Sequence, residues 1–596
     1  MSDSPTIDSG HLLRYKITSN GTAVGDEIRV VSIHVHCAIN RIPSAEILIL
    51  DGDMPEQMFP ISDGDSFKPG AEIVIEAGYD DTSEAIFSGI VIRHGLRITG
   101  DNYSCLVIEC RDKAVKMTIG RKNANYVDMS DSDIFSKLLG NYAGLTSDVS
   151  STNTQHKELV QHYCTDWDFL ISRAEINGMI VVPGQNKVTV QIPQTDGEPQ
   201  LTVQYGEDLL EFQAYIDCRT QLTSVKAVVW DPSSQAVVEQ TASPVTLNEQ
   251  GDLSSADLAQ VASPDTFRLQ TPAVMQQTEV TAWADSQQLK ASLARIRGQM
   301  KFQGDAKAKI GNLIKVKGVG NRFSGSVFVC SVRHEIVRGN WVTEVDFGSP
   351  PEWFADQRDV IAPPASGLLP GINGLHLGVV KKLDEDPASE KRIQVSIPLL
   401  QADVDGVWAR LSNFYASNAV GDFFIPEIGD EVVLGYLNDD PSNPVILGSL
   451  YSSSRTPPYD LTAENNTKAI VTRGNLRLIF DEDKKVVTII TPANNQIVVS
   501  DDTKSITLQD QNGNKAQLSP DGILLDSPKD IVVKAQGKIS MSAVGEISIA
   551  AQADVKVSGL NVTNTAQVGF TGKGSATAEL SASGQTTVKG ALVMIN

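Results

Sequence analysis

The sequence has few cations, few cysteines and no long apolar run. Its 50 Lys and Arg residues face 73 Asp and Glu, a net charge of −23. This argues against nucleic acid or an anionic membrane as the main partner, because both favour clustered cations. Six cysteines in 596 residues do not make a disulfide framework. No apolar stretch reaches membrane-spanning length, so we expect no transmembrane helix.

The opening residues bear on where the protein is made. The opening residues MSDSPTIDSG contain neither the basic nor the apolar segment of a secretory signal. We therefore expect synthesis in the cytoplasm without a cleaved signal peptide, and any later export by another route. A chain of 596 residues with 41% hydrophobic residues is globular in class and too long for one core, which predicts three or more domains.

Residues 1–360 are mostly strand-like, and their pattern also predicts three helices, over 131–144, from Thr165 or Asp166 to Gly178, and over 280–298. Two segments, 67–98 and 309–337, share a glycine, an alternating strand, a Phe-Ser-Gly triplet and a second alternating strand. This repetition predicts a duplicated pair of small antiparallel β-barrels. The alternative is a chance similarity between two ordinary hairpins.

A Pro- and Gly-rich linker over 361–374 is followed by short strands with frequent turns over 375–458. This spacing favours a five-stranded barrel of the OB type. OB barrels that bind single-stranded nucleic acid have basic grooves with exposed aromatic residues. Here the predicted loops are acidic, which makes that function a weak hypothesis: Asp384, Glu385, Asp386, Asp439 and Asp440.

Residues 459–596 are dominated by an eight-residue repeat. Each repeat has two apolar residues two positions apart, a small residue such as Gly537 or Gly545, and a charged residue before the apolar pair. A helix would scatter such a pair, whereas a strand places both residues on one face. The strand rhythm begins near Val486 and continues to the last pair, Leu592 and Met594. The pattern predicts a β-solenoid.

Each octad offers only about two apolar side chains to an interior, which is little for one chain to enclose. Three chains winding round a common axis would bring three copies of each side chain together and close the core. We therefore prefer a triple-stranded, trimeric β-helix to a lone solenoid. Its predicted core residues are Ile531, Val533, Ile539, Met541, Ile547, Ile549, Val555 and Val557.

No residue pattern predicts catalysis, a metal site or a cofactor. His34 and His36 share a strand face but lack a third ligand at useful spacing. Glu427 and Glu431 flank a predicted turn, as structural carboxylates do. The main alternative function is a solenoid carbohydrate-binding adhesin or enzyme. Such an enzyme would cluster acids on one outer face, whereas the outer octad positions mix Lys538 with Glu546.

The OB stretch resembles VgrG-type spike proteins and the related baseplate spikes of contractile phage tails. The matching segments are VWARL (407–411), FIPEIGDEVVLGYL (424–437), DPSNPVILGSLY (440–451) and Pro457-Pro458. In that family, octad β-helices follow the OB domain directly. The segment CTDWDFLISRAEINGM (164–179) is similar to part of the family's hub, so the resemblance covers nearly the whole chain in the same order.

The resemblance implies a mainly β fold: a hub of two small β-barrels with a few helices, an OB-fold barrel and a trimeric β-helix. It implies a non-enzymatic homotrimer in the baseplate of a contractile injection machine, where it joins a hexameric inner tube to a membrane-puncturing needle. The implied partners are the inner tube protein, baseplate components, a PAAR-type tip protein and effector cargo, without nucleic acid. The target membrane would be pierced transiently, and the spike released or delivered into target cells.

Two departures from the family bear on the type of machine. Only about 30 residues separate Tyr451 from the first repeats, too few for the lysozyme of the phage spike. The loop DEDPASEKRIQV (384–395) lacks a longer insertion common in type VI secretion proteins, which favours an extracellular or phage-like particle.

The last octads predict a docking platform. Interior pairs shrink to Ala576 and Ala578 and then to Gly584 and Thr586, before bulk returns near the end of the sequence. Apolar side chains and strand edges gathered on one small face are normally covered. We therefore expect a small tip protein to dock on Leu592, Met594 and Ile595.

Overall fold

The computed structural model of the protein describes residues 3–5, 12–101, 103–357, 360–398 and 406–595. The chain divides into two compact units, Met1–Leu450 and Tyr451–Asn596. The fold is mainly β, as the sequence predicts. The α-helices among the described residues all belong to the first unit.

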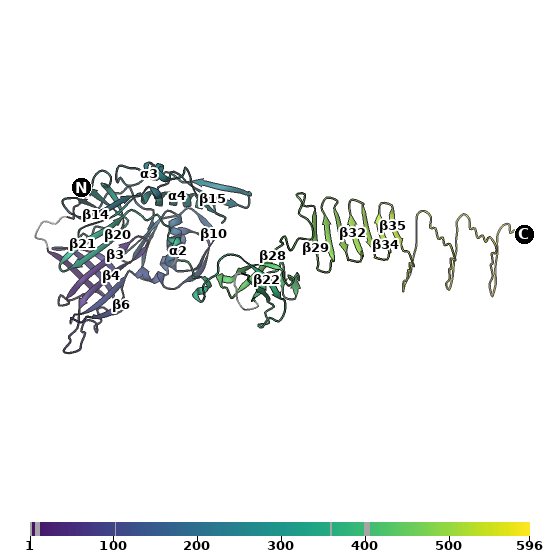
Figure 1. The fold of residues 1–596 in the computed structure, drawn as a ribbon, viewed down its shortest axis with the longest axis horizontal. Coiled ribbons are helices and arrows are strands. Elements are labelled where there is room, and N and C mark those ends of the chain that lie inside the picture. Colours follow the sequence, from purple (N-terminus) through teal and green to yellow (C-terminus); the bar gives the residue numbers. More distant parts are fainter. Residues whose placement is uncertain (1–2, 6–11, 102, 358–359, 399–405, 596) are drawn as a thin grey trace. The chain divides into compact units, whose positions relative to one another are not determined.

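One thirteen-stranded sheet organises the first unit (Figure 1). Its two halves have the same strand order. Numbered along the chain, the six strands of each half lie side by side in the order 1-4-5-6-3-2. The first half contains β1 (Leu13–Ser19), β3 (Val30–Ala38), β4 (Arg41–Leu50), β5 (Glu72–Tyr79), β6 (Thr82–Ile98) and β7 (Ser104–Arg111), with β2 (Thr22–Ala23) at its edge. The second half contains β13 (Leu201–Gln204), β14 (Leu209–Ile216), β18 (Ile296–Gln303), β19 (Leu313–Lys317), β20 (Gly325–Val337) and β21 (Asn340–Phe347).

The two halves that correspond to the expected pair of small barrels share a seam. Strand β20 pairs with β3 in antiparallel register, which makes the sheet continuous. The halves differ in one pairing, since β1 runs antiparallel to β5 whereas β13 runs parallel to β19. Each half packs mainly on its own apolar core. The matching strand order supports a duplication of the whole half.

The two Phe-Ser-Gly triplets do not occupy equivalent places in their hairpins. Gly89 lies opposite Ile73, three positions after Gly70. Gly325 lies opposite Val316, five positions after Gly311. Both Gly89 and Gly325 do sit where another backbone passes closely: a Cβ would lie 2.2 Å from Arg111 O or from Glu249 O, respectively. The topology is duplicated, but the triplets are displaced along it.

Two predicted helices begin where the sequence places them, although the first ends at Gly140 and not at the predicted residue 144. Helix α1 (Asp131–Gly140) starts at the capping box of Ser130, and α2 (Asp166–Ile176) is capped by Thr165. The prediction over 280–298 is wrong at its end, because α4 (Gln277–Leu293) stops earlier and Gly298 lies inside β18. A Cβ at Gly298 would lie 2.2 Å from Gln213 O, so this glycine permits close strand packing. Helix α3 (Ser255–Ala262) was not predicted.

Smaller sheets accompany these helices in the first unit. They are formed by β8 (Lys122–Ser130) with β10 (Gln155–Cys164), by β9 (Thr146–Val149), β11 (Ile180–Gly184) and β12 (Lys187–Gln191), and by β15 (Val225–Asp231), β16 (Ala236–Thr241) and β17 (Phe267–Thr271). Helix α4 packs on the last of these sheets through Val280 and Ala284.

A closed five-stranded barrel confirms the predicted OB-type domain. Its strands are β22 (His376–Lys382), β23 (Ile393–Ser396), β24 (Val407–Leu411), β27 (Glu431–Tyr436) and β28 (Pro444–Ser449). The alternating pattern of these strands places Val380, Val395 and Leu434 in a fully buried core. A short hairpin, β25 (Ala416–Ser417) and β26 (Val420–Gly421), precedes β27.

The second unit begins with a seven-stranded antiparallel sheet, here called the hairpin sheet. Its strands follow one another in chain order: β29 (Thr467–Val471), β30 (Arg477–Asp481), β31 (Val486–Ile490), β32 (Gln496–Ser500), β33 (Ser505–Gln509), β34 (Lys515–Ser519) and β35 (Gly522–Asp526). The strand rhythm predicted from Val486 is present. However, the chain here forms hairpins, which the sequence pattern does not distinguish from a solenoid.

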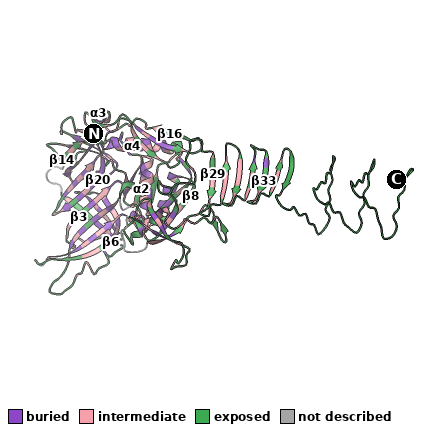
Figure 2. Ribbon diagram, turned by 45° about the vertical axis from the view of Figure 1, so that its right-hand side comes forward, coloured by how far each residue is buried: buried purple, intermediate pink, exposed green. Residues whose placement is uncertain are grey.

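Residues 530–595, the octad segment, contain no strand assigned within this chain. All of these residues are described, and none of their backbone N–H groups donates to a carbonyl of the same chain. Figure 2 shows the segment exposed throughout. The octads therefore lack both backbone partners and a buried interior in the single chain.

Candidate functional site

The strongest candidate site is one face of the hairpin sheet, where apolar side chains form two rows. Residues directly opposite each other on antiparallel strands point to the same face. The first row joins Ile470, Leu478, Ile489, Ile497, Leu508, Ala516 and Leu525. The second row joins Phe480, Val487, Val499, Ile506, Leu518 and Ile523.

These rows are largely open to solvent. Phe480 is 38% exposed and Ile523 is 76% exposed, and most of the other large side chains of the two rows lie between these values. Around Ala516, whose side chain is short, a groove of about 620 Å³ runs along the first row as far as Ile531. An apolar face of this size on one sheet is a surface that a partner normally covers.

A repeated turn builds this sheet. The turns that open at Thr472, Thr491 and Asp510 have the same backbone hydrogen bonds. In each turn the side chain of the first residue accepts from the N–H four residues on. The fourth residue, Asn475, Asn494 or Gly513, has positive φ, which Asn and Gly adopt at least cost. The 19-residue spacing of these turns was the sequence signal that could have revealed the hairpin sheet.

In the single chain, the octad side chains predicted to form a trimer core are not packed into any core. Their exposed fractions range from 48% for Ile547 to 74% for Val557. The three predicted tip-docking residues are exposed by 75% or more. Figure 1 draws this segment as repeated open windings without strands. The assignment of core and tip residues therefore stays a prediction.

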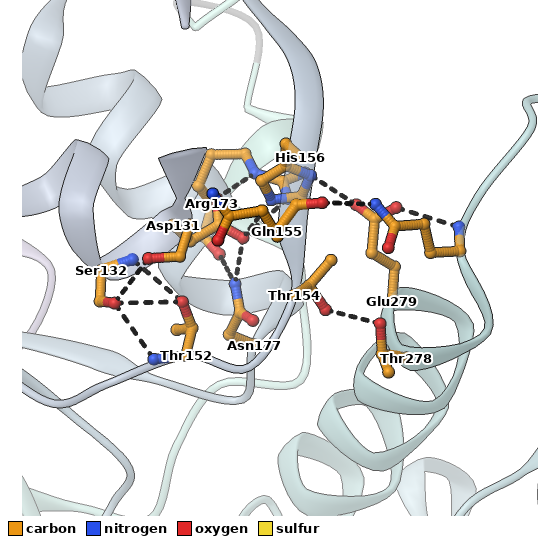
Figure 3. Close-up of polar contacts among 12 residues, drawn as sticks. Asp131, Ser132, Thr152, Thr154, Gln155, His156, Arg173, Asn177, Thr278 and Glu279 are labelled. Carbon is orange, nitrogen blue, oxygen red and sulfur yellow. Dashed lines mark hydrogen bonds and ion pairs between the residues drawn. The ribbon is translucent and has the colours of Figure 1, made fainter. Parts of the chain in front are cut away.

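A buried polar cluster in the first unit was the best candidate for chemistry (Figure 3). Asp131, at the start of α1, is 1% exposed and accepts two hydrogen bonds of 2.9 Å from Arg173 of α2. Asn177 donates a third at 2.9 Å. His156 of β10 lies with Nε2 2.9 Å from Asp131 and Nδ1 3.3 Å from Glu279 of α4. The cluster thus ties four elements together.

The geometry of this cluster is that of a structural crosslink. Burial would raise the pKa of Asp131, but the hydrogen bonds and charge of Arg173 and the hydrogen bonds of Asn177 and His156 outweigh it and lower that pKa. Both ring nitrogens of His156 face carboxylates. The ring therefore has no free nitrogen with which to activate a nucleophile.

The other residues considered from sequence do not converge on a site. His34 is exposed, and His36 Nε2 lies 3.1 Å from Ser331 Oγ. Burial, followed by the charge of Arg333, lowers the pKa of His36. Burial raises the pKa of the Cys37 thiol to about 12, which leaves it protonated. Among the described residues, no group of three or more His, Cys, Asp or Glu could hold a metal ion.

Comparison with known families identifies the first unit. Residues 9–338 match the family model described as "Alg8 N-terminal domain", which covers more than half of the chain. The chain belongs to the Alg8 N-terminal domain family. Residues 376–451 match the "Type VI secretion system/phage-baseplate injector OB domain", the same stretch that forms the closed barrel.

Curated relatives confirm the resemblance to VgrG-type spike proteins. The chain is 38% identical over 85 residues to the type VI secretion system spike protein VgrG1c of Pseudomonas aeruginosa, covering 13% of this chain and 12% of the relative. It is 42% identical over 64 residues to the actin cross-linking toxin VgrG1 of Vibrio cholerae, covering 11% and 6%. The matches therefore span about an eighth or less of each relative.

Solved structures of tail and secretion proteins also align with the chain. The 43 kDa tail protein of prophage MuSo2 from Shewanella oneidensis aligns with a TM-score of 0.43 at 10% identity, over 57% of this chain and 99% of that protein. The Escherichia coli c3393 protein, a component of the type VI secretion system, aligns with a TM-score of 0.36 at 12% identity, over 73% of this chain and all of that protein.

None of the helices among the described residues is both long enough and apolar enough to cross a membrane.

Proposed function

We propose that the protein is a non-enzymatic, homotrimeric spike of a contractile injection machine. In this proposal the first unit docks on a hexameric inner tube and the second unit forms the needle that pierces the target membrane. The confirmed relation to VgrG-type spikes supports the machine. The needle role rests on the second unit of this chain.

The observation that carries the proposal is the incomplete second unit. The hairpin sheet leaves two apolar rows uncovered, and the octads lack backbone partners altogether. Removing a half-exposed Ile, Leu, Val or Phe side chain from water stabilises an assembly by about 1 kcal/mol. Covering the two rows would therefore stabilise it by about 10 kcal/mol per chain. This is of the size needed to offset the free-energy cost of association.

Three copies would cover the apolar rows and supply backbone partners to the octads better than two. Two copies would cover each other's apolar rows as a two-sheet sandwich, so the sheet alone allows a dimer. The octads turn a corner at small residues such as Gly537 and Gly545, and each offers only two apolar side chains to the interior. Three chains winding together would fill the open windings and bring three copies of Ile547 to one axis.

The duplicated sheet supports the role at the tube. Each chain has two halves with the same strand order. Three chains would therefore present six similar halves, which suits a threefold spike that meets a hexameric tube.

The far end of the octad segment is the proposed docking site of a PAAR-type tip protein. The side chains of Leu592 and Met594 are exposed by 79% and 75%. They follow the narrow positions Ala576 and Gly584, so bulk returns where the interior has narrowed. Effector cargo and release into target cells are further parts of this proposal.

The short OB loop favours an extracellular or phage-like particle. Asp386 accepts hydrogen bonds from the backbone of Ala388, Glu390 and Arg392 and from the Arg392 side chain, which closes the loop tightly. A loop closed in this way leaves no long insertion for further contacts. The alternative of a carbohydrate-active solenoid lacks a supporting cluster of acids on the octads.

The oligomeric state is the direct test. Light scattering on the purified full chain should give three times the 64.2 kDa of one chain. A dimer would support the sandwich of two hairpin sheets in place of the spike. A monomer at micromolar concentration would contradict the proposal.

A further inference from the structure

The octads do not fix their own register. Ile531, Ile539 and Ile547 recur every eight residues, each with an apolar residue two positions later. If one chain slid along its neighbours by eight residues, an isoleucine would again meet isoleucines. Segments with such repeated patterns specify their pairing weakly.

The hairpin sheet does not share this degeneracy. Its second row contains one aromatic residue, Phe480, and its first row contains one alanine, Ala516. A shift by one strand would place Phe480 level with Val487 and Ala516 level with Leu508. Mismatches of this size cost about 1–3 kcal/mol each by overpacking, and more where a cavity is left.

The hairpin sheet is also already formed in the single chain. All six strand pairings from β29 to β35 are made within one chain. It can therefore present a finished apolar surface, whereas the octads gain backbone partners only from other copies. Of the two regions, only the sheet can recognise a second copy before assembly.

The surface of the sheet continues into the first octad. The groove along the first row is lined by Ile489, Ile497 and Leu508 and reaches Ile531. A side chain that fills this groove contacts both the sheet and the first octad. Docking of another copy on the apolar face of the sheet therefore positions the start of the octads.

We propose that the hairpin sheet is a register-setting clamp, which docks on the hairpin sheets of the other copies and aligns the octads before they wind. This inference rests on the homotrimer proposed above. It adds a division of roles: the sheet recognises the other copies, and the octads follow.

The test uses the full chain with Ile547→Cys, whose copies meet only when the octads are in register. A disulfide needs Cβ atoms about 3.5–4.5 Å apart, so oxidation links two chains only in register. Leu508→Asp breaks the first apolar row. Thr507→Asp is the matched control, because it lies on the same strand and points to the opposite face. The unaltered chain controls for the native cysteines.

We expect the disulfide yield to fall at least fivefold with Leu508→Asp and to stay unchanged with Thr507→Asp. Loss of the trimer in Leu508→Asp, with the trimer kept in Thr507→Asp, would also support the clamp. Equal yields in the two variants would overturn it. A monomeric Ile547→Cys protein without further substitution would instead contradict the proposed trimer.

A reciprocal variant keeps the test decisive if Leu508→Asp proves hard to purify. Ile547→Asp should disrupt the octads but leave the chains associated through the sheet. Light scattering should report a trimer, or the dimer that the sheet alone allows, and hydrogen exchange should show the octads unprotected. If Ile547→Asp yields monomers at the same concentration, the octads and not the sheet hold the copies together, and the inference fails.

Discussion

The hairpin sheet and the octad segment are both repetitive strand-like regions, but they depend on other copies in different ways. The sheet makes its own backbone hydrogen bonds and lacks only cover for one apolar face. The octads make neither backbone bonds nor a core within the chain. The comparison shows that apolar residues two positions apart do not reveal whether a repeat can fold within one chain. The turn between the strands determines this.

The largest expected effect is in the octads. Ile547→Asp should place three carboxylates in one apolar layer of the trimer, at a cost of several kcal/mol for each uncompensated charge. The octads should then fail to close. Ser548→Asp, at the neighbouring outward position, should be tolerated. Thermal unfolding followed by circular dichroism measures both, and equal stability of the two variants would rule out this core assignment.

The next effect should appear in the first unit and should not depend on protein concentration. Asp131→Asn removes the carboxylate that accepts from Arg173, and leaving such a partner buried without its charge costs about 3–5 kcal/mol. Lys157→Ala is the control, because its pair with Asp128 is 88% and 59% exposed and contributes no more than about 1 kcal/mol. Denaturant unfolding measures both variants. A similar loss in the two would contradict the crosslink.

Acid should weaken the same crosslink. The pKa of Asp131 is lowered on folding from its ordinary 3.8. Its contribution is therefore present above that value and is lost as pH falls through the lower folded pKa. The wild-type protein should lose more stability than Asp131→Asn between pH 4 and pH 2, as thermal unfolding would show. Parallel pH profiles would contradict this.

The smallest effect should be in the turns of the hairpin sheet. Asn494 has a φ of 64°, so Asn494→Ala should cost the sheet about 1 kcal/mol. Asn494→Gly should be close to neutral, since glycine adopts positive φ freely. Urea unfolding of the two variants checks this. A larger loss with glycine than with alanine would contradict the turn assignment.

Local signals in the sequence predicted much of the fold. The caps at Ser130 and Thr165 set helix starts because they act within three residues. Gly298 was misread because a glycine that ends a helix and one that lies under a strand look alike in sequence. Its constraint comes from Gln213, far away along the chain. The crosslink at Asp131 was also missed, since the residues clustered with it come from three other elements.

The candidate site was predicted only in part. The octad pairs were recognised, but Phe480, Val487 and Ile489 were not assigned to a surface. Their grouping depends on hairpin register, which is set by turns at Thr472, Thr491 and Asp510. The 19-residue spacing of these turns is weaker than the octad repeat, because only the turn-opening and positive-φ residues recur.

Hydrogen exchange of the octads in the purified protein tests the central claim most directly. The single chain offers no acceptor for the backbone N–H groups of residues 530–595. The account therefore predicts that peptides spanning Ile531 to Val557 are strongly protected in the assembled protein and lose this protection on dilution. The peptides of the hairpin sheet should keep part of theirs. Octad peptides that exchange at unprotected rates at every concentration would contradict the account.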